Sequence, residues 1–281
     1  MDGVIFRNMT RDEVETAVEW AAREGWNPGL SDAECFYRTD PEGFFCAETE
    51  GKIVGTVSVV NYDDRFSFYG LFIVDPAFRA KGIGMALYRH AMKHAGPRIV
   101  GCDGIVAMAG KYQKDGGFFL HYNNARYQGT GGGMMPGGLT PLRDIAFRDL
   151  VSYDAARFPA RREEFLRCWT TRPGHFGLAR LSASGEILGY GVRRACRTGH
   201  KIGPLFACDR ETAGLILDGL LFGIPGEPFF LDIPVPNKEA AALVNDRGME
   251  PVFFTARLYT TPDPVPLPLG EIFGVTTFEL G

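Results

Sequence analysis

The sequence predicts an α/β protein made of two tandem halves, each with a mixed, mostly antiparallel twisted sheet flanked by helices. The length indicates two domains, because 281 residues exceed the roughly 100–200 residues of one compact domain. The pattern of apolar runs supports this division, because its order in the first half repeats after a glycine-rich segment. We therefore expect domains at 1–130 and 140–262, a linker at 131–139 and a tail at 263–281.

The first half begins with a strand and two helices and continues mainly as strands. Thr10 and Glu13 have the spacing of a capping box, which predicts that a helix starts behind Thr10. Apolar runs separated by turn residues predict the strands. In chain order, we expect a strand at 4–7, helices after Thr10 and at 31–38, strands at 43–47, 53–60 and 66–74, a helix at 84–94, a strand at 98–102, a helix at 105–114 and a strand at 118–127.

The segment from Leu71 to Leu87 joins an apolar strand, a glycine-bearing turn and the start of a helix. Its turn, Arg79 to Gly84, has the pattern R-x-x-G-x-G. The turn lacks the Gly-Lys-Ser/Thr ending of a Walker A loop, and its glycines do not fit the GxGxxG dinucleotide fingerprint. A helix N-terminus behind such a turn presents unpaired N–H groups that suit a phosphate. A glycine-lined turn without a ligand is the alternative interpretation.

This turn and its flanks resemble the coenzyme A loop of the GNAT superfamily of N-acetyltransferases. The resemblance covers about the first 130 residues and includes the pattern from Tyr112 to Phe118. It implies that acetyl-CoA is the cosubstrate and that the strand offers backbone groups to its pantetheine arm and thioester carbonyl. It also implies that the N–H groups of the turn hold the pyrophosphate. The residues assigned to coenzyme A in this way are Phe72, Ile73, Val74, Arg79, Ala80, Lys81, Gly82, Ile83 and Gly84.

The resemblance gives Tyr112 the role of general acid, which protonates the coenzyme A thiolate. One extra glycine stands between Tyr112 and Phe118, and a core tyrosine has the same appearance in sequence. The general base is not visible, because the strand at 67–71 has no carboxylate. A water chain is one candidate, and four side chains are the others: Asp63, Asp64, Asp103 and His121.

Two residues are candidates for the site of the acceptor amine. Trp26 follows the first helix, in a segment that lines the acceptor site of the resembled family. An indole that tucks into the core is the alternative for Trp26. Asp232 ends a strand of the second half, and a role at the strand end explains it equally well.

The second half repeats the order of the first but lacks the R-x-x-G-x-G turn. Acidic residues at 209–212 stand in its place and repel a pyrophosphate, so we expect one coenzyme A site, in the first half. Asp209 and Asn237 are expected helix caps, and the end of the tail is expected to add an edge strand. In chain order, we expect a strand at 142–147, helices at 149–158 and 161–168, strands at 176–181, 187–192 and 201–207, a helix at 211–221, a strand at 229–233, a helix at 238–246 and a strand at 252–258.

Composition and charge argue against several classes of protein. The net charge of −4 gives no basic field for nucleic acid, and no apolar run approaches the ~20 residues that span a membrane. The first 25 residues have no signal-peptide core. The six cysteines are scattered without a CxxC pair, which favours reduced thiols in a cytoplasmic protein. No His, Cys or carboxylate cluster has the spacing of a metal site.

Together these features predict a cytoplasmic N-acetyltransferase that moves an acetyl group from acetyl-CoA to the amine of a small molecule. The alternative is a coenzyme A-binding sensor that has lost its catalytic apparatus, which the missing carboxylate favours. A longer acyl donor is a third hypothesis, although 22 phenylalanines fill two large cores as readily as they line an enlarged tunnel.

Overall fold

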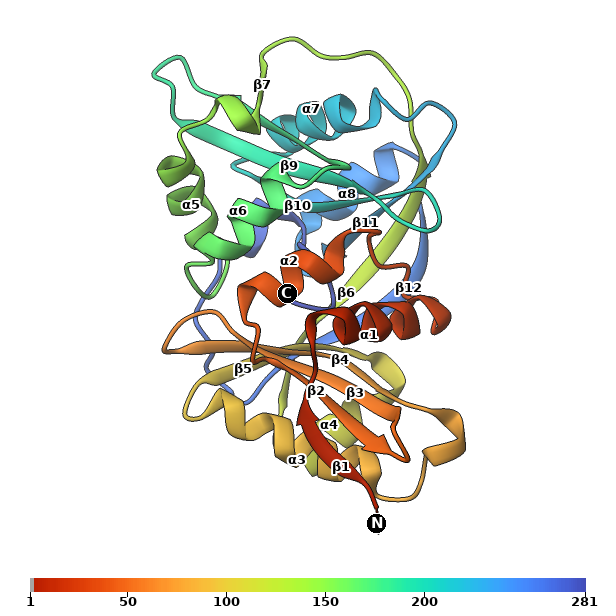
Figure 1. Cartoon of the computed structure of the whole chain (residues 1–281). Coiled ribbons are helices and arrows are strands. Elements are labelled where there is room, and N and C mark those ends of the chain that lie inside the picture. Colours follow the sequence, from red (N-terminus) through yellow and green to blue (C-terminus); the bar gives the residue numbers. More distant parts are fainter. Residues whose placement is uncertain (1–2) are drawn as a thin grey trace.

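The computed structural model describes residues 3–281, in which 13 strands form one sheet that runs through both halves (Figure 1). Helices cover the sheet, and the C-terminus lies in the middle of the molecule beside α2. The strands are β1 (Ile5–Asn8), β2 (Phe44–Thr49), β3 (Lys52–Asn61), β4 (Phe66–Val74), β5 (Ile99–Ile105), β6 (Phe119–Thr130), β7 (Leu139–Pro141), β8 (His175–Leu181), β9 (Ile187–Ala195), β10 (His200–Ala207), β11 (Pro228–Pro234), β12 (Glu250–Tyr259) and β13 (Ile272–Gly274). The helices are α1 (Arg11–Arg23), α2 (Asp32–Thr39), α3 (Ile83–Ala95), α4 (Ala109–Gly116), α5 (Phe147–Ala155), α6 (Glu163–Thr171), α7 (Arg210–Leu221) and α8 (Lys238–Asp246).

The sixth strand of each half is exchanged with the other half. The strand order is β1-β2-β3-β4-β5-β12-β6-β11-β10-β9-β8-β7, which gives the same arrangement when it is followed from either end. β12 is antiparallel to both β5 and β6, and β6 is antiparallel to β11. Each half therefore completes its sheet with a strand from the other.

Most of the expected elements form within a few residues of their predicted bounds. Thr10 and Glu13 make the capping box at the start of α1. Asp209 and Asn237 cap α7 and α8, because each side chain accepts hydrogen bonds from N–H groups of the first turn. Local patterns therefore predict the helix starts well.

The strand expected at 142–147 is wrong. β7 ends at Pro141, a 3-10 helix takes Leu142–Asp144, and α5 begins at Phe147. Proline has no N–H for a strand ladder, which ends the pairing of β7 at this point. Leu142 is buried and packs over Gly177 of β8, where a side chain would collide with it.

The tail does not add an edge strand, contrary to expectation. β13 pairs with β10 inside the sheet, beyond the three residue pairs over which β10 is parallel to β11. The N–H of Val275 donates to the carbonyl of Asp232 on β11, at 2.8 Å. The tail therefore fills the gap where β10 and β11 diverge.

Two of the six cysteines form a disulfide that ties the two halves together. Cys35 of α2 is bonded to Cys168 of α6, and their Cα atoms lie 5.4 Å apart across 133 residues of chain. The prediction of six reduced thiols is wrong for this pair, because the packing of α2 against α6 is not visible in cysteine spacing. The free cysteines are Cys46, Cys102, Cys196 and Cys208.

Candidate active site

β4 and β5 diverge in the first half and leave one edge of β4 open. The two strands are parallel and pair only from Phe66 to Tyr69 on β4. Leu71 has a φ of 47°, and the register of β4 against β3 shifts beside it, which marks a β-bulge. Beyond Tyr69, the edge of β4 that faces β5 has no strand partner within residues 3–281. Backbone groups at the end of β4 are therefore available to a ligand.

A cavity of about 520 Å³ opens at this divergence. Its walls come from β4, β5, the glycine turn, α3, α4, β12 and the tail. Nine of the twelve residues predicted for the site line it: Trp26, Phe72, Ile73, Val74, Arg79, Ala80, Gly82, Gly84 and Tyr112. Lys81, Ile83 and Asp232 are outside its lining.

The glycine turn brings the N-terminus of α3 against the end of β4. Gly82 is the N-cap of α3 and has a φ of 81°, in the left-handed region that favours glycine. A Cβ at Gly84 would lie 3.2 Å from the Phe72 ring and 3.3 Å from the Val74 side chain, so this helix turn packs closely on β4. No acidic residue stands in the first turn of α3. The turn therefore presents a positive helix end at the cavity.

Arg79 in the cavity lining and Lys81 in the adjoining turn carry positive charge. Arg79 donates to the Val74 carbonyl at 2.8 Å and pairs with Glu24 at 2.8 Å, which fastens the turn to β4 and α1. The Lys81 ammonium lies 4.9 Å from the centre of the Phe78 ring. Both side chains are placed to add to the field of the helix end.

Tyr112 of α4 lies flat against β5. A Cβ at Gly104 would collide with its ring at 2.5 Å, so a glycine is needed beneath it. The extra glycine of the sequence, Gly117, is a left-handed C-cap whose N–H bonds to the Tyr112 carbonyl. Burial raises the pKa of Tyr112. The Tyr112 side chain lines the cavity.

Two buried carboxylates line the cavity. Asp103 is one of the four candidate bases, and it is bound in a bidentate pair by Arg257 at 2.7 and 2.6 Å. Asp63, Asp64 and His121 are outside the lining of the cavity. Glu279 is the second carboxylate, and sequence reasoning missed it because it stands in the tail, far from every motif.

Both halves match models of one family. The "Acetyltransferase (GNAT) family" model matches residues 11–115, and the "Acetyltransferase (GNAT) domain" model matches residues 150–274. Holothin acyltransferase of Pseudoalteromonas sp. (strain SANK 73390) is 30% identical over 276 residues, which cover 96% of this chain and 92% of that protein. The chain belongs to the GNAT family. It is an acyltransferase with two GNAT domains in tandem, and the family uses acyl-CoA as its donor.

Solved structures share the fold of this tandem GNAT acyltransferase. A putative acetyltransferase from Pyrococcus horikoshii superposes with a TM-score of 0.83 at 22% identity, over 100% of this chain and 97% of that one. A tandem GNAT protein from the clavulanic acid biosynthesis pathway gives 0.63 at 17% identity, over 92% and 99% of the two chains. At identities below 25%, the similarity to these two structures shows the fold and not the activity.

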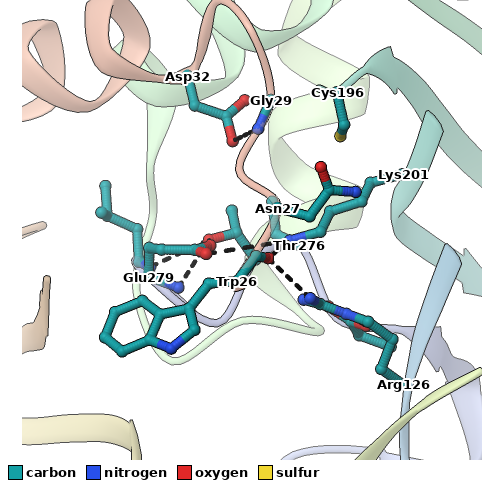
Figure 2. Close-up of polar contacts among 12 residues, drawn as sticks. Trp26, Asn27, Gly29, Asp32, Arg126, Cys196, Lys201, Thr276 and Glu279 are labelled. Atoms are coloured by element: carbon teal, nitrogen blue, oxygen red, sulfur yellow. Dashed lines mark hydrogen bonds and ion pairs between the residues drawn. The ribbon is translucent and has the colours of Figure 1, made fainter. Parts of the chain in front are cut away.

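Asp232 lies away from the cavity in this GNAT acyltransferase. Its carboxylate accepts two hydrogen bonds from Arg126, at 2.7 and 2.8 Å, and both side chains are buried. Arg126 also donates to the Trp26 carbonyl at 2.8 Å (Figure 2). The pair therefore fastens the turn that carries Trp26 to the strands β6 and β11.

Membrane spans and metal clusters are both absent from residues 3–281. No helix in this range is long and apolar enough to cross a membrane. No group of three or more His, Cys, Asp or Glu side chains in the same range is arranged to hold a metal ion.

Proposed function

We propose that this acyltransferase moves an acetyl group from acetyl-CoA to the amine of a small molecule. The observation that carries the proposal is the cavity between the open edge of β4 and the N-terminus of α3. An extended ligand with amide groups can bind such an edge as an added strand does. The helix end suits the pyrophosphate of the donor. The thioester supplies an activated acyl carbon.

We infer one donor site per chain, because the two places where parallel strands diverge, β4/β5 and β10/β11, differ. The gap between β4 and β5 is a cavity, whereas the gap between β10 and β11 is filled by β13. Asp209 caps α7 at the position where the first half has Gly82. The second half therefore lacks both the space and the charge that a pyrophosphate needs.

A small aromatic amine fits the acceptor end of the cavity. Trp26, Phe253 and Phe278 line this end together with Glu279. The relative named Holothin acyltransferase agrees with a small-molecule acceptor. We propose that the enzyme works in the cytoplasm without nucleic acid or membrane partners, and the net charge of −4 supports the absence of a nucleic-acid partner.

The chain's own residues have separate tasks in this reaction. The glycine turn binds the donor, and the end of β4 orients the acyl group, so that much of the rate enhancement comes from positioning. The hydroxyl of Tyr112, which lines the cavity, gives its proton to the departing thiolate. The apolar walls exclude water from the thioester.

Titration calorimetry with acetyl-CoA, followed by a thiol-release screen over small amines, tests the proposal. We expect binding in the micromolar range and thiol release with at least one aromatic amine. Binding without turnover on any amine would contradict the acetyltransferase assignment. The absence of binding would contradict the donor site itself.

Replacing Tyr112 with Phe is expected to lower kcat by about 10²-fold, the usual scale of a general acid. The Kd for acetyl-CoA should stay within about twofold, because the ring still packs on Gly104. A thiol-release assay measures kcat, and calorimetry measures the Kd for acetyl-CoA. Tyr37→Phe is the control, since Tyr37 is a tyrosine outside the cavity lining. If kcat is unchanged in Tyr112→Phe, Tyr112 is not the general acid and contributes only packing.

A further inference from the structure

The tail carries a carboxylate from the second half to the cavity of the first. After β13, the chain crosses to β4, where the Glu279 carbonyl lies directly against Gly70 and leaves no space for a side chain there. Gly70 precedes the bulge at Leu71, at the start of the open edge of β4. Glu279 is 1% exposed and lines the cavity. It therefore lies beside the place where the acyl group is expected.

The carboxylate of Glu279 has one satisfied and one unsatisfied oxygen. Oε2 accepts a hydrogen bond from the Thr277 hydroxyl at 2.5 Å. Oε1 is buried without a hydrogen-bond partner within residues 3–281. Its neighbour is the Lys201 ammonium at 3.9 Å, which is beyond hydrogen-bond distance (Figure 2). A buried acceptor left open in this way costs stability and calls for an explanation.

The surrounding charges keep Glu279 ionised. Burial by itself raises the pKa of this carboxyl, but Lys201, the Thr277 hydroxyl and further cations lower the pKa below its usual value. The charged groups that act on it are Arg126 on β6, Arg194 on β9 and Lys201 on β10, which lower its pKa, and Asp103 on β5, which carries a like charge. Lys201 itself is held by the Trp26 carbonyl at 3.0 Å.

The other carboxylates of the cavity are differently placed. Both oxygens of Asp103 are occupied, by Arg257 and by the Asn124 amide. Glu24 and Asp115 are exposed at the mouth of the cavity. Among the carboxylates that line the cavity, Glu279 is thus the buried one with an oxygen that lacks a hydrogen-bond partner within residues 3–281.

We propose that Glu279 is the general base that takes the proton from the acceptor amine. This inference rests on the proposed acetyl transfer. The amine nitrogen forms a bond to the acyl carbon while one of its protons passes to the Glu279 carboxylate. The C–S bond then breaks, and the leaving thiolate takes the hydroxyl proton of Tyr112. Solvent returns a proton to Tyr112 and removes the one on Glu279.

Glu279→Gln tests this role in the full-length enzyme, with acetyl-CoA as the donor and tyramine and benzylamine as acceptor probes. At about pH 7, we expect kcat to fall by roughly 10²-fold, the scale of a lost general base. The Kd for acetyl-CoA should stay within about twofold. The loss should shrink as the pH rises to about 9.5, because an aliphatic amine then loses its proton to solvent. Glu279→Asp, which keeps a carboxylate, should recover part of the rate.

Glu271→Gln is the matched control. Glu271 is a tail carboxylate paired with Arg157, it lies outside the cavity lining, and its variant should keep the wild-type kcat. Equal kcat in Glu279→Gln and wild type would overturn the inference, and so would a loss of rate that is the same at every pH. A wild type that binds acetyl-CoA but releases no thiol with any probe overturns the acetyl-transfer proposal, and this inference falls with it. If Glu279→Gln does not fold, wild-type activity in Glu279→Ala or no activity in Glu279→Asp likewise counts against it.

Discussion

Gly84→Glu is expected to raise the Kd for acetyl-CoA by at least ~100-fold, which corresponds to about 2.7 kcal/mol. Gly84 stands in the first turn of α3 and lines the cavity. A carboxylate at this position cancels the positive field of the helix end and repels a pyrophosphate. The close approach to Phe72 and Val74, at 3.2 and 3.3 Å, leaves little room for a side chain at this position.

Calorimetric titration measures the change, and thermal unfolding checks that the variant is folded. Gly137→Glu is the control, because it adds the same charge at a glycine where an added Cβ would meet nothing within 4 Å. Gly84→Ala should give an intermediate loss, since it adds the steric contact without the charge. If Gly84→Glu binds acetyl-CoA as tightly as the control, the donor is not held at the glycine turn.

The donor end of this site could be predicted because its residues are contiguous in the chain. Strand, turn and helix from Phe72 to Gly84 form one local pattern, and the fold brings that pattern to the cavity intact. The helix starts at Thr10, Asp209 and Asn237 were predictable for the same reason, since a cap acts within four residues.

The acceptor end was not predictable, because its groups meet only after long-range pairing. Glu279 reaches Gly70 of β4 from the far end of the chain. Arg126 meets Asp232 across 106 residues, on strands that pair only because β6 is exchanged between the halves. Apolar alternation marks β6 and β12 as strands, but it does not determine which neighbour each will take. The Cys35–Cys168 disulfide was missed on the same grounds.

Asp232→Asn is expected to lower the free energy of unfolding by about 3–5 kcal/mol, the scale of a broken buried ion pair. The side chains of Arg126 and Asp232 are buried together, so the variant leaves the guanidinium without its counter-charge. Within residues 3–281, the further contacts of Arg126 are the Trp26 carbonyl, the faces of two phenylalanine rings and the more distant charge of Glu279. Those contacts do not replace a carboxylate.

Urea unfolding measures the loss, and Asp246→Asn is the control. Asp246 pairs with Arg210 at 3.4 Å on the exposed surface of α8, so its variant should change stability by less than about 1 kcal/mol. The double variant Arg126→Met/Asp232→Leu should recover part of the stability, because the cost comes from the unpaired charge more than from the missing bond. If Asp232→Asn instead keeps the wild-type stability and raises the KM for the amine, the result would support the sequence-based prediction that Asp232 contacts the acceptor.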